Sequence, residues 1–330
     1  MFTLFATLRR FTWPQAALAL ALAWTSGLAA AQYPERPIRI VVPSPAGDGS
    51  DVLARALSKA MGEAMGQSFV IDNKPGAGGS IGAQQVARAA SDGYTLFLAN
   101  ASSHGVTPGL YPSLPYDSVA DFAPVGLIAT APNLLVVRSD AGIASYADYV
   151  RQARQQPGKL SIASAGSGSL SHLSAELLRS SAGLDLLHVP YKGAAPALTD
   201  IMGGQVASII INIPSVLPHI ANGRMTPLAV TSAKRAAALP NVPTLMESGV
   251  RGYDTVAWFG LLAPARTPPE LLQKLHTQLQ AALRQPEVRD TLTRLGAESS
   301  GAGPREFGEF MRSEMAKYDA VIKSASIKIN

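Results

Sequence analysis

Short apolar runs alternate with segments of helical periodicity through most of this chain, and this alternation limits the folds that it can adopt. Apolar runs at residues 38–42, 69–71 and 95–99 have the length and composition of buried strands. Between them, residues 52–65 and 80–90 repeat apolar side chains at the spacing of one helix face. Strands that alternate with helices form a mainly parallel sheet covered by helices, so the sequence predicts the α/β class.

A second series of the same kind begins near residue 134. It predicts strands at residues 134–137, 160–163, 187–189, 208–211 and 228–230, and helices at residues 145–156, 169–182 and 194–202. Helical stripes at residues 271–283 and 307–322 are expected to pack back on the first series. Because roughly 300 residues exceed the usual size of one core, two lobes are predicted. Lobe 1 is expected to comprise residues 32–133 and 255–330, and lobe 2 residues 134–254.

The first 31 residues have the composition of an export signal. Arg9 and Arg10 precede an apolar run at residues 16–23, and small residues at 29–31 predict cleavage between Ala31 and Gln32. The run is too short to span a bilayer core, which needs about 20 apolar residues. We therefore expect a periplasmic protein.

The chain contains no cysteine. Disulfides, thiol catalysis and thiolate metal sites are thereby excluded, and so is a lipid anchor on a cysteine at the cleavage site. The net charge of +5 is spread along the chain without a Lys/Arg run, which disfavours nucleic acid as a partner. The five histidines show no spacing typical of zinc ligands, so no metal or cofactor is expected.

The turn at residues 42–51 connects a predicted strand to a predicted helix. Gly47 and Gly49 allow a ligand to approach the backbone closely, and Ser50 is the expected N-cap. The N-terminus of the helix presents free N–H groups and the positive end of its dipole, which favour a carboxylate or phosphate. Asp51 in the first turn has the alternative role of complementing that dipole.

A second turn of this kind lies at residues 162–169, in the other predicted lobe. It carries three hydroxyl groups after the strand and two glycines, in the order Ser164, Gly166, Ser167, Gly168 and Ser169. Two helix N-termini that face each other across a cleft would bind an anion without any cationic side chain. The sequence therefore predicts an anion-binding site between two lobes that close on the ligand.

Two enzymatic interpretations of the same loops are weaker. Ser167 or Ser169 with His172 could suggest a serine hydrolase, but the order of residues does not give the G-x-S-x-G motif, and we expect His172 to cap or pack locally. The glycines at 76–82 resemble a dinucleotide loop, but Ile81 stands where its third glycine belongs. A tight turn accounts for that segment better.

An ordered series of motifs covers essentially the whole chain after residue 32 and resembles the Bug family, the extracytoplasmic receptors of tripartite tricarboxylate transporters. The motifs are Tyr-Pro-Glu-Arg-Pro-Ile at 33–38, the Pro-x-Pro-Ala-Gly turn at 43–51, Asn-Lys-Pro-Gly-Ala-Gly-Gly at 73–79, and the segments at 92–96, 114–117, 121–125, 188–193, 203–206, 239–244 and 258–260.

The resemblance implies a type II periplasmic-binding-protein fold with two Rossmann-like lobes, a central cleft and two crossovers. It implies a receptor without catalytic activity, expected as a monomer, that delivers a small carboxylate to membrane permease subunits. A receptor that serves a signalling partner instead would share this fold. The ligand-binding positions implied are Ala46, Gly47, Asp48, Gly49, Asp51, Asn100, Ala101, Ser102, Ser164, Gly166, Ser167, Gly168, Ser169, His172 and Asn212, with Trp258 near the hinge or cleft.

Three positions depart from the pattern of the family. Ser44 stands where relatives usually carry an aromatic residue, Asp48 where they carry glycine, and Asn212 where many carry aspartate. A carboxylate at Asp48 would repel a second negative group on the ligand. We therefore hypothesise a monocarboxylate, or a ligand with an amino or ring-nitrogen group; the alternative is that Asp48 points to solvent.

Overall fold

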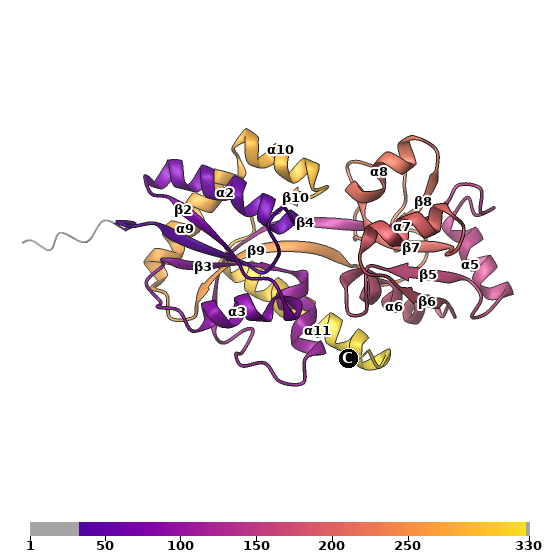
Figure 1. The fold of residues 1–330 in the computed structure, drawn as a ribbon, viewed down its shortest axis with the longest axis horizontal. Helices are drawn as coiled ribbons and strands as arrows, with labels where there is room; N and C mark the ends of the chain where they lie inside the picture. Colours follow the sequence, from indigo (N-terminus) through magenta and orange to yellow (C-terminus); the bar gives the residue numbers. More distant parts are fainter. Residues whose placement is uncertain (1–32, 328–330) are drawn as a thin grey trace, which may run out of the picture. The chain divides into compact units, whose positions relative to one another are not determined.

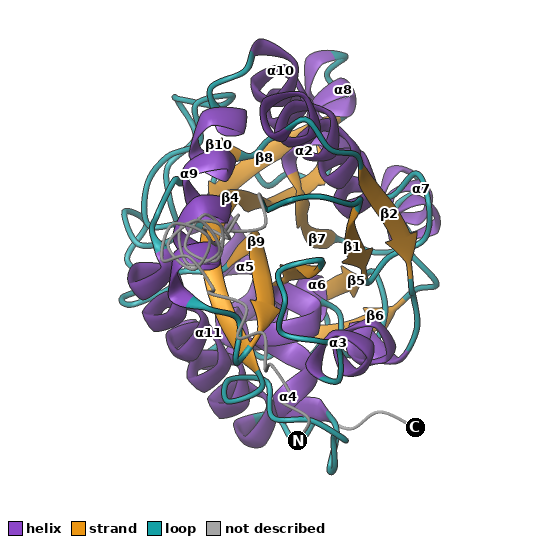
Figure 2. Cartoon of the chain, turned by 90° about the vertical axis from the view of Figure 1, so that its left-hand side faces the viewer, coloured by secondary structure: helices purple, strands orange, loops and turns teal. Residues whose placement is uncertain are grey.

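The computed structural model describes residues 33–327, so the predicted export segment lies outside the described residues. From Arg36 onward the chain forms one compact unit. Its strands form a mixed sheet in the order β2-β1-β3-β9-β4-β7-β5-β6, with β10 and β8 also pairing with β4. Helices lie around the outside of this sheet (Figure 2). The predicted α/β class is confirmed.

Lobe 1 contains the first three strands, which are parallel neighbours as predicted: β1 (Ile38–Val42), β2 (Phe69–Asn73) and β3 (Thr95–Asn100). β9 (Val256–Pro264) returns antiparallel beside β3, and the short β10 (Glu298–Ser299) pairs with β4. The main helices of this lobe are α2 (Gly49–Met65), α3 (Ser80–Ala87), α9 (Pro269–Leu283), α10 (Pro286–Arg294) and α11 (Pro304–Ser324).

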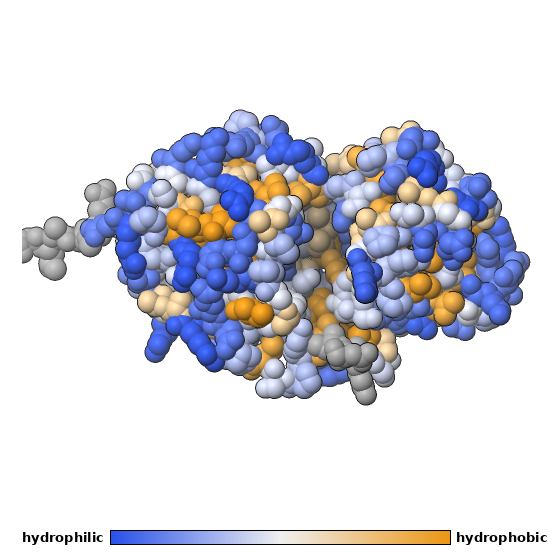
Figure 3. Space-filling model, in the orientation of Figure 1, coloured by the Kyte–Doolittle hydropathy of each residue, from blue (hydrophilic) through white to orange (hydrophobic). Residues whose placement is uncertain are grey.

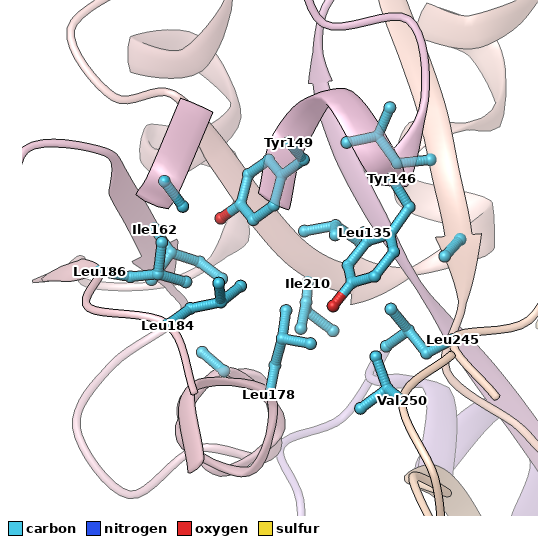
Figure 4. Packing of buried hydrophobic residues seen from close by; sticks show 14 of the residues in the cluster. Leu135, Tyr146, Tyr149, Ile162, Leu178, Leu184, Leu186, Ile210, Leu245 and Val250 are labelled. Atoms are coloured by element: carbon cyan, nitrogen blue, oxygen red, sulfur yellow. The ribbon is translucent and has the colours of Figure 1, made fainter. Parts of the chain in front are cut away.

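Lobe 2 contains β5 (Ser161–Ser164), β6 (Leu187–Pro190), β7 (Ser208–Asn212) and β8 (Met225–Val230). Its helices are α5 (Tyr146–Gln155), α6 (Leu170–Ala182), α7 (Ala194–Met202) and α8 (Ile213–Ala221). α5 and α6 pack on the sheet through Tyr149, Leu178 and their neighbours, as Figure 4 shows. The hydroxyl of buried Tyr149 meets that of Ser208 at 2.9 Å, which satisfies both groups inside this core.

One strand, β4 (Phe122–Arg138), belongs to both lobes (Figure 1). Its first part pairs with β9, and from Asn133 it pairs with β7 and β8. The sequence predicted only the part after residue 134. The first part was not predicted because it contains Pro124 and Gly126, and proline and glycine are poor strand residues. In the structure, these two residues lie at an irregularity in the pairing with β9.

The C-terminal helix α11 packs on lobe 1 as predicted and also contacts α6 of lobe 2. Tyr318 of α11 lies in one buried cluster with Leu173 of α6. Trp258, expected near the hinge or cleft, is fully buried against Phe307 and Phe310, and its partner Thr130 lies three residues before Asn133, where β4 begins to pair with β7. Its position in β9 opposite Thr130 of β4 explains this burial, because α11 covers this part of the sheet.

Candidate ligand site

The loop after β1 ends at the N-terminus of α2, but the N-cap differs from the prediction. Asp48, not Ser50, caps the helix: its backbone is extended and its carboxylate accepts a hydrogen bond from the Ser50 amide at 3.4 Å. The prediction of Ser50 was wrong by two residues because serine and aspartate are equally good caps. The Ser50 hydroxyl instead accepts a hydrogen bond from the Asn100 side chain at 3.2 Å.

Asp51 is buried beneath this loop, with 1% of its surface exposed. Its carboxylate accepts hydrogen bonds from the Gly47 amide at 2.8 Å, from Arg55 at 2.9 Å and from the Asn73 side chain at 3.0 Å. Burial alone would raise the pKa of Asp51, but these three donors outweigh it and lower the pKa. Asp51 therefore fixes the loop from below. Asn73, which the sequence analysis did not select, also donates to the Ser44 carbonyl at 3.0 Å.

Asn100 ends β3 beside this loop. The side-chain oxygen of Asn100 accepts a hydrogen bond from the backbone amide of Ser103 at 2.9 Å. In return, the backbone amide of Asn100 donates to the Ser103 hydroxyl at 3.1 Å, which makes a reciprocal capping box. Residues Ala101–Val106 then form a π-helical turn, a rare geometry that is frequent at functional sites. Ala101 is buried and Ser102 is exposed.

The second loop connects β5 to α6, and Ser169 is the N-cap of α6. Gly166 (φ +139°) and Gly168 (φ +76°) have backbone conformations that side chains rarely adopt, which explains the two glycines. The Ser169 hydroxyl donates to the Gly166 carbonyl at 2.7 Å and accepts from the His172 amide at 3.2 Å. The loop is thus closed by its own hydrogen bonds.

His172 supports this loop from within α6, as expected of a residue that packs locally. Its Nδ1 accepts a hydrogen bond from the Gly168 amide at 3.1 Å. Its ring stacks on that of His188 from β6, with 4.0 Å between centroids and 7° between planes. The Nε2 atom of His188 lies 2.7 Å from the hydroxyl of buried Ser164. His188 was not selected from the sequence, because nothing in the spacing of the two histidines predicts a stack.

Two charged residues on α6 complete this cluster. Glu176 lies with its Oε1 3.8 Å from Nε2 of His172, and Arg179 binds the same carboxylate through contacts of 2.8 and 2.9 Å. Burial lowers the pKa of His172, and Arg179 lowers it further. Burial and the neighbouring His172 lower the pKa of His188 to about 4. Both imidazoles are therefore neutral at neutral pH.

The two loops belong to adjoining parts of the structure. Helix α6 contacts the π-helical turn after Asn100, and Leu170, its first residue, packs against the cluster that includes Ala101. On the face drawn in Figure 3, a furrow runs between the two lobes. Asn212 ends β7 in lobe 2, and its side-chain oxygen accepts hydrogen bonds from Ser215 as the N-cap of α8.

Backbone donors dominate what this site offers to a ligand. In the described part of the loops, the amides of Ala46, Gly49, Ser167, Leu170 and Ser171 have no acceptor within the protein. Such amides at helix N-termini bind carboxylates and other anions. No group of three or more potential metal ligands occurs within residues 33–327, and no helix among them is long and apolar enough to cross a membrane.

The geometry disfavours hydrolysis. His172 directs Nδ1 at the Gly168 amide and the Ser169 hydroxyl donates to a backbone carbonyl, so the two do not form a nucleophile–base pair. Ser164 does meet His188, but its side chain is fully buried and therefore does not present its hydroxyl as a nucleophile.

Comparison with known proteins decides the family. Residues 53–327 match the model of the tripartite tricarboxylate transporter family receptor, TctC. The chain belongs to this family. It is 35% identical to the protein BugT of Bordetella pertussis over 310 residues, which cover 92% of this chain and 95% of BugT.

Two solved structures resemble this one along nearly their whole length. The structure titled R. palustris Rpa4515 with adipate is 39% identical, with a TM-score of 0.76, and the match covers 90% of this chain and 99% of that one. MatC of Rhodopseudomonas palustris with bound malate is 33% identical, with a TM-score of 0.73 and coverage of 88% and 100%. The predicted two-lobe periplasmic-binding-protein fold, the Bug resemblance and the absence of enzymatic function are confirmed.

Proposed function

We propose that this TctC-family protein is a periplasmic receptor that captures a small carboxylate between its two lobes and delivers it to the permease subunits of a tripartite tricarboxylate-type transporter. The observation that carries the proposal is the pair of strand–loop–helix elements at Asp48 and Ser169, each with backbone amides that lack an acceptor. The relatives solved with adipate and malate support a carboxylate as the ligand class. Residues 1–31 would direct export and be removed.

The two helix N-termini differ in charge, and this difference orients the ligand in our proposal. Ser169 caps α6 with a neutral hydroxyl, whereas Asp48 places a carboxylate on α2. An incoming carboxylate is repelled by the second and not by the first. We therefore assign the ligand carboxylate to the loop of Ser164–Ser169, with His172 behind it. The other end of the ligand, beside residues 46–51 and Asn100–Ser102, would be neutral or cationic.

The lobe boundaries are proposed as residues 32–133 with 255–330 for lobe 1, and 134–254 for lobe 2. Closure of these lobes would bring both loops onto the ligand. Asn212 would line the same cleft from the end of β7, beside Asn133 of β4, to which it is paired. We expect a monomer, because each chain contains both loops.

The test is a titration of residues 32–330, expressed as the mature form. A panel of monocarboxylates, dicarboxylates, amino acids and pyridine carboxylates is followed by the melting temperature and by calorimetry. A ligand at about 100 times its dissociation constant stabilises the native state by roughly 2.7 kcal/mol, which raises the melting temperature by several degrees. Saturable binding of a carboxylate supports the proposal. If the panel fails against protein that has been denatured and refolded to remove retained ligand, the proposal is wrong.

A further inference from the structure

The stacked pair of His172 and His188 lies behind the loop of lobe 2 and makes two contacts with it, one through each ring. His172 Nδ1 accepts the Gly168 amide, and Ser164, which meets His188, accepts the Gly166 amide at 3.3 Å. These are the two glycines with positive φ. The pair therefore holds Gly168 directly and Gly166 through Ser164, and the amide of Ser167 between them has no acceptor in the protein.

The contact between His172 and Gly168 requires a neutral His172 ring. Nδ1 of His172 can accept a hydrogen only when it carries none, so its proton resides on Nε2, which faces Glu176. The Ser164 hydroxyl lies 3.3 Å from both the amide and the carbonyl of Gly166 and 2.7 Å from Nε2 of His188, so it can either donate to that Nε2 or accept a hydrogen from it. Protonation of His172 at Nδ1 removes the acceptor for Gly168. Protonation of both rings places two positive charges 4.0 Å apart.

The surrounding charges favour the neutral state. Glu176 alone would stabilise an imidazolium, but Arg179 binds its carboxylate through two contacts and neutralises it. The strands β5 and β6 contribute Ser164 and His188 itself, and α11 packs on α6 through Tyr318 at Leu173. Burial and the proximity of the rings lower both pKa values, in agreement with this geometry.

We propose that His188 is a positioning residue for the ligand site: through Ser164 and His172 it holds the loop of Ser164–Ser169 in the shape that binds a carboxylate, and protonation of His172 at Nδ1 releases the loop. This proposal rests on the proposed function for its consequence, since the loop is where we assign the ligand carboxylate. It goes further in two ways. It names a residue that acts on the site without touching the ligand, and it predicts that low pH weakens binding by protonating the protein, in addition to any protonation of the ligand.

The first arm of the test needs no ligand. Protection of the Gly168 amide from hydrogen exchange, corrected for the intrinsic rate, is measured by NMR between pH 8 and pH 4. We expect wild type to lose roughly tenfold in protection as the pH falls through the titration of the pair. His172→Asn keeps an acceptor at the position of Nδ1 without titrating, so protection should persist in acid; His172→Phe should abolish it at every pH. Equal protection in His172→Phe and wild type would overturn the proposal.

The second arm separates a positioning role from a structural one. Arg179→Gln frees Glu176 to stabilise an imidazolium, so the pH midpoint for loss of Gly168 protection should move upward. His188→Gln keeps a partner for Ser164 but removes the second titrating ring, so its midpoint should also move. His276→Asn replaces a histidine of α9 in lobe 1, away from both loops, and should leave the midpoint unchanged. If neither Arg179→Gln nor His188→Gln moves it, the pair does not control the loop.

The third arm links the loop to binding, with adipate and acetate as probes at pH 7.5 and pH 5. Weaker binding at pH 5 in wild type, with a smaller loss in His172→Asn, which keeps the acceptor without titrating, supports the proposal. An identical pH profile in the two proteins contradicts it while leaving the receptor function intact. If wild type binds no carboxylate from the panel above, the proposed function is wrong, and the Gly168 measurements still decide whether His188 and His172 shape the loop.

Discussion

The buried carboxylate of Asp51 accepts a hydrogen bond from the backbone amide of Gly47, four residues earlier, at 2.8 Å. This contact holds the loop after β1 against the first turn of α2. The same carboxylate also accepts hydrogen bonds from Arg55 of α2 and Asn73 of β2. It therefore connects the helix, the strand and the loop. Its role is to shape the backbone that meets the ligand, and the charge of Asp51 is balanced within the protein by Arg55.

Asp51→Asn should destabilise the protein by about 1–3 kcal/mol, because the new amide group would face donors and leave one of them unsatisfied. Thermal and urea unfolding at pH 7 measure the loss. Asp148→Asn is the matched control, since Asp148 also lies in a first helical turn and binds an arginine but is more exposed, and it should cost less than about 1 kcal/mol. Equal losses in the two variants would show that the burial of Asp51 is unimportant.

Asp48→Gly should improve binding of dicarboxylates relative to monocarboxylates. Removing a like charge near the ligand is worth about 1 kcal/mol or more, which is roughly fivefold in affinity. Asp48→Asn keeps the N-cap without the charge and should behave similarly, which separates electrostatics from capping. Asp140→Asn, an exposed aspartate of lobe 2, serves as the control and should change nothing. Unchanged selectivity in both Asp48 variants would refute the orientation proposed for the ligand.

Ser169→Ala should weaken ligand binding and lower stability by about 1 kcal/mol, because the hydroxyl both caps α6 and holds the Gly166 carbonyl. Ser145→Ala removes the equivalent N-cap of α5, away from both loops, and should cost the same stability without affecting affinity. Calorimetric titration alongside thermal unfolding distinguishes the two effects. A loss of affinity in Ser145→Ala of the same size would mean that global destabilisation is the cause.

Gly260→Ala should destabilise lobe 1 by about 1–3 kcal/mol through overpacking. A Cβ atom at this position in β9 would overlap the ring of Phe307, which is fully buried against Trp258. Adding Phe307→Leu should relieve part of the loss, and a double-mutant cycle of unfolding free energies measures the coupling. Gly203→Ala is the control, because a Cβ atom there would meet only the carbonyl oxygens of Thr199 and Asp200, at 3.4 and 3.6 Å. Additive losses at Gly260 and Phe307 would exclude the overlap.

The buried His104 should make the protein less stable in mild acid. Burial lowers the pKa of His104 to about 3, and its Nε2 has no partner among the described residues. Below pH 6.5 His104 binds a proton in the unfolded chain, whereas in the native state it binds one only near pH 3. The free energy of unfolding therefore decreases as the pH is lowered from 6.5 to about 3. His104→Asn should flatten the slope by up to about 1.4 kcal/mol per pH unit. A slope identical to that of wild type in urea unfolding at several pH values would contradict this.

Much of the fold followed from periodicity. The parallel strands β1, β2 and β3 and the helix α7 (Ala194–Met202) were predicted within one or two residues, because apolar spacing reports directly on burial. α8 was missed because Pro214 and Pro218 interrupt its pattern, and α10 because it is short and mostly polar. β9 was recognised only as the motif around Trp258, since a strand covered on both faces has no alternation to detect.

For the site, the sequence located both loops because glycine and serine cluster at these two strand–helix junctions, where a tight turn and an N-cap both favour them. It did not locate what supports them. The bond from Asn100 to Ser50 joins residues 50 apart, and the stack of His172 on His188 joins two elements whose separation depends on the whole sheet. Such contacts follow from tertiary structure and leave no local pattern. Which loop residues touch the ligand remains a prediction.

The position of β9 between β3 and β4 bears on how this chain reaches its native state. Lobe 2 draws β5 to β8 from one continuous stretch, whereas the sheet of lobe 1 has a central vacancy until residues 256–264 are available. Until then, the edges of β3 and β4 offer unpaired backbone groups on both sides of a gap. The sheet of lobe 1 is thus completed by a strand from the last third of the chain. The pairing of Phe97 with Leu262 closes a long loop, which has a large entropic cost. Before β9 is inserted, these two edges are therefore open to pairing with another chain, and its insertion removes this route to aggregation.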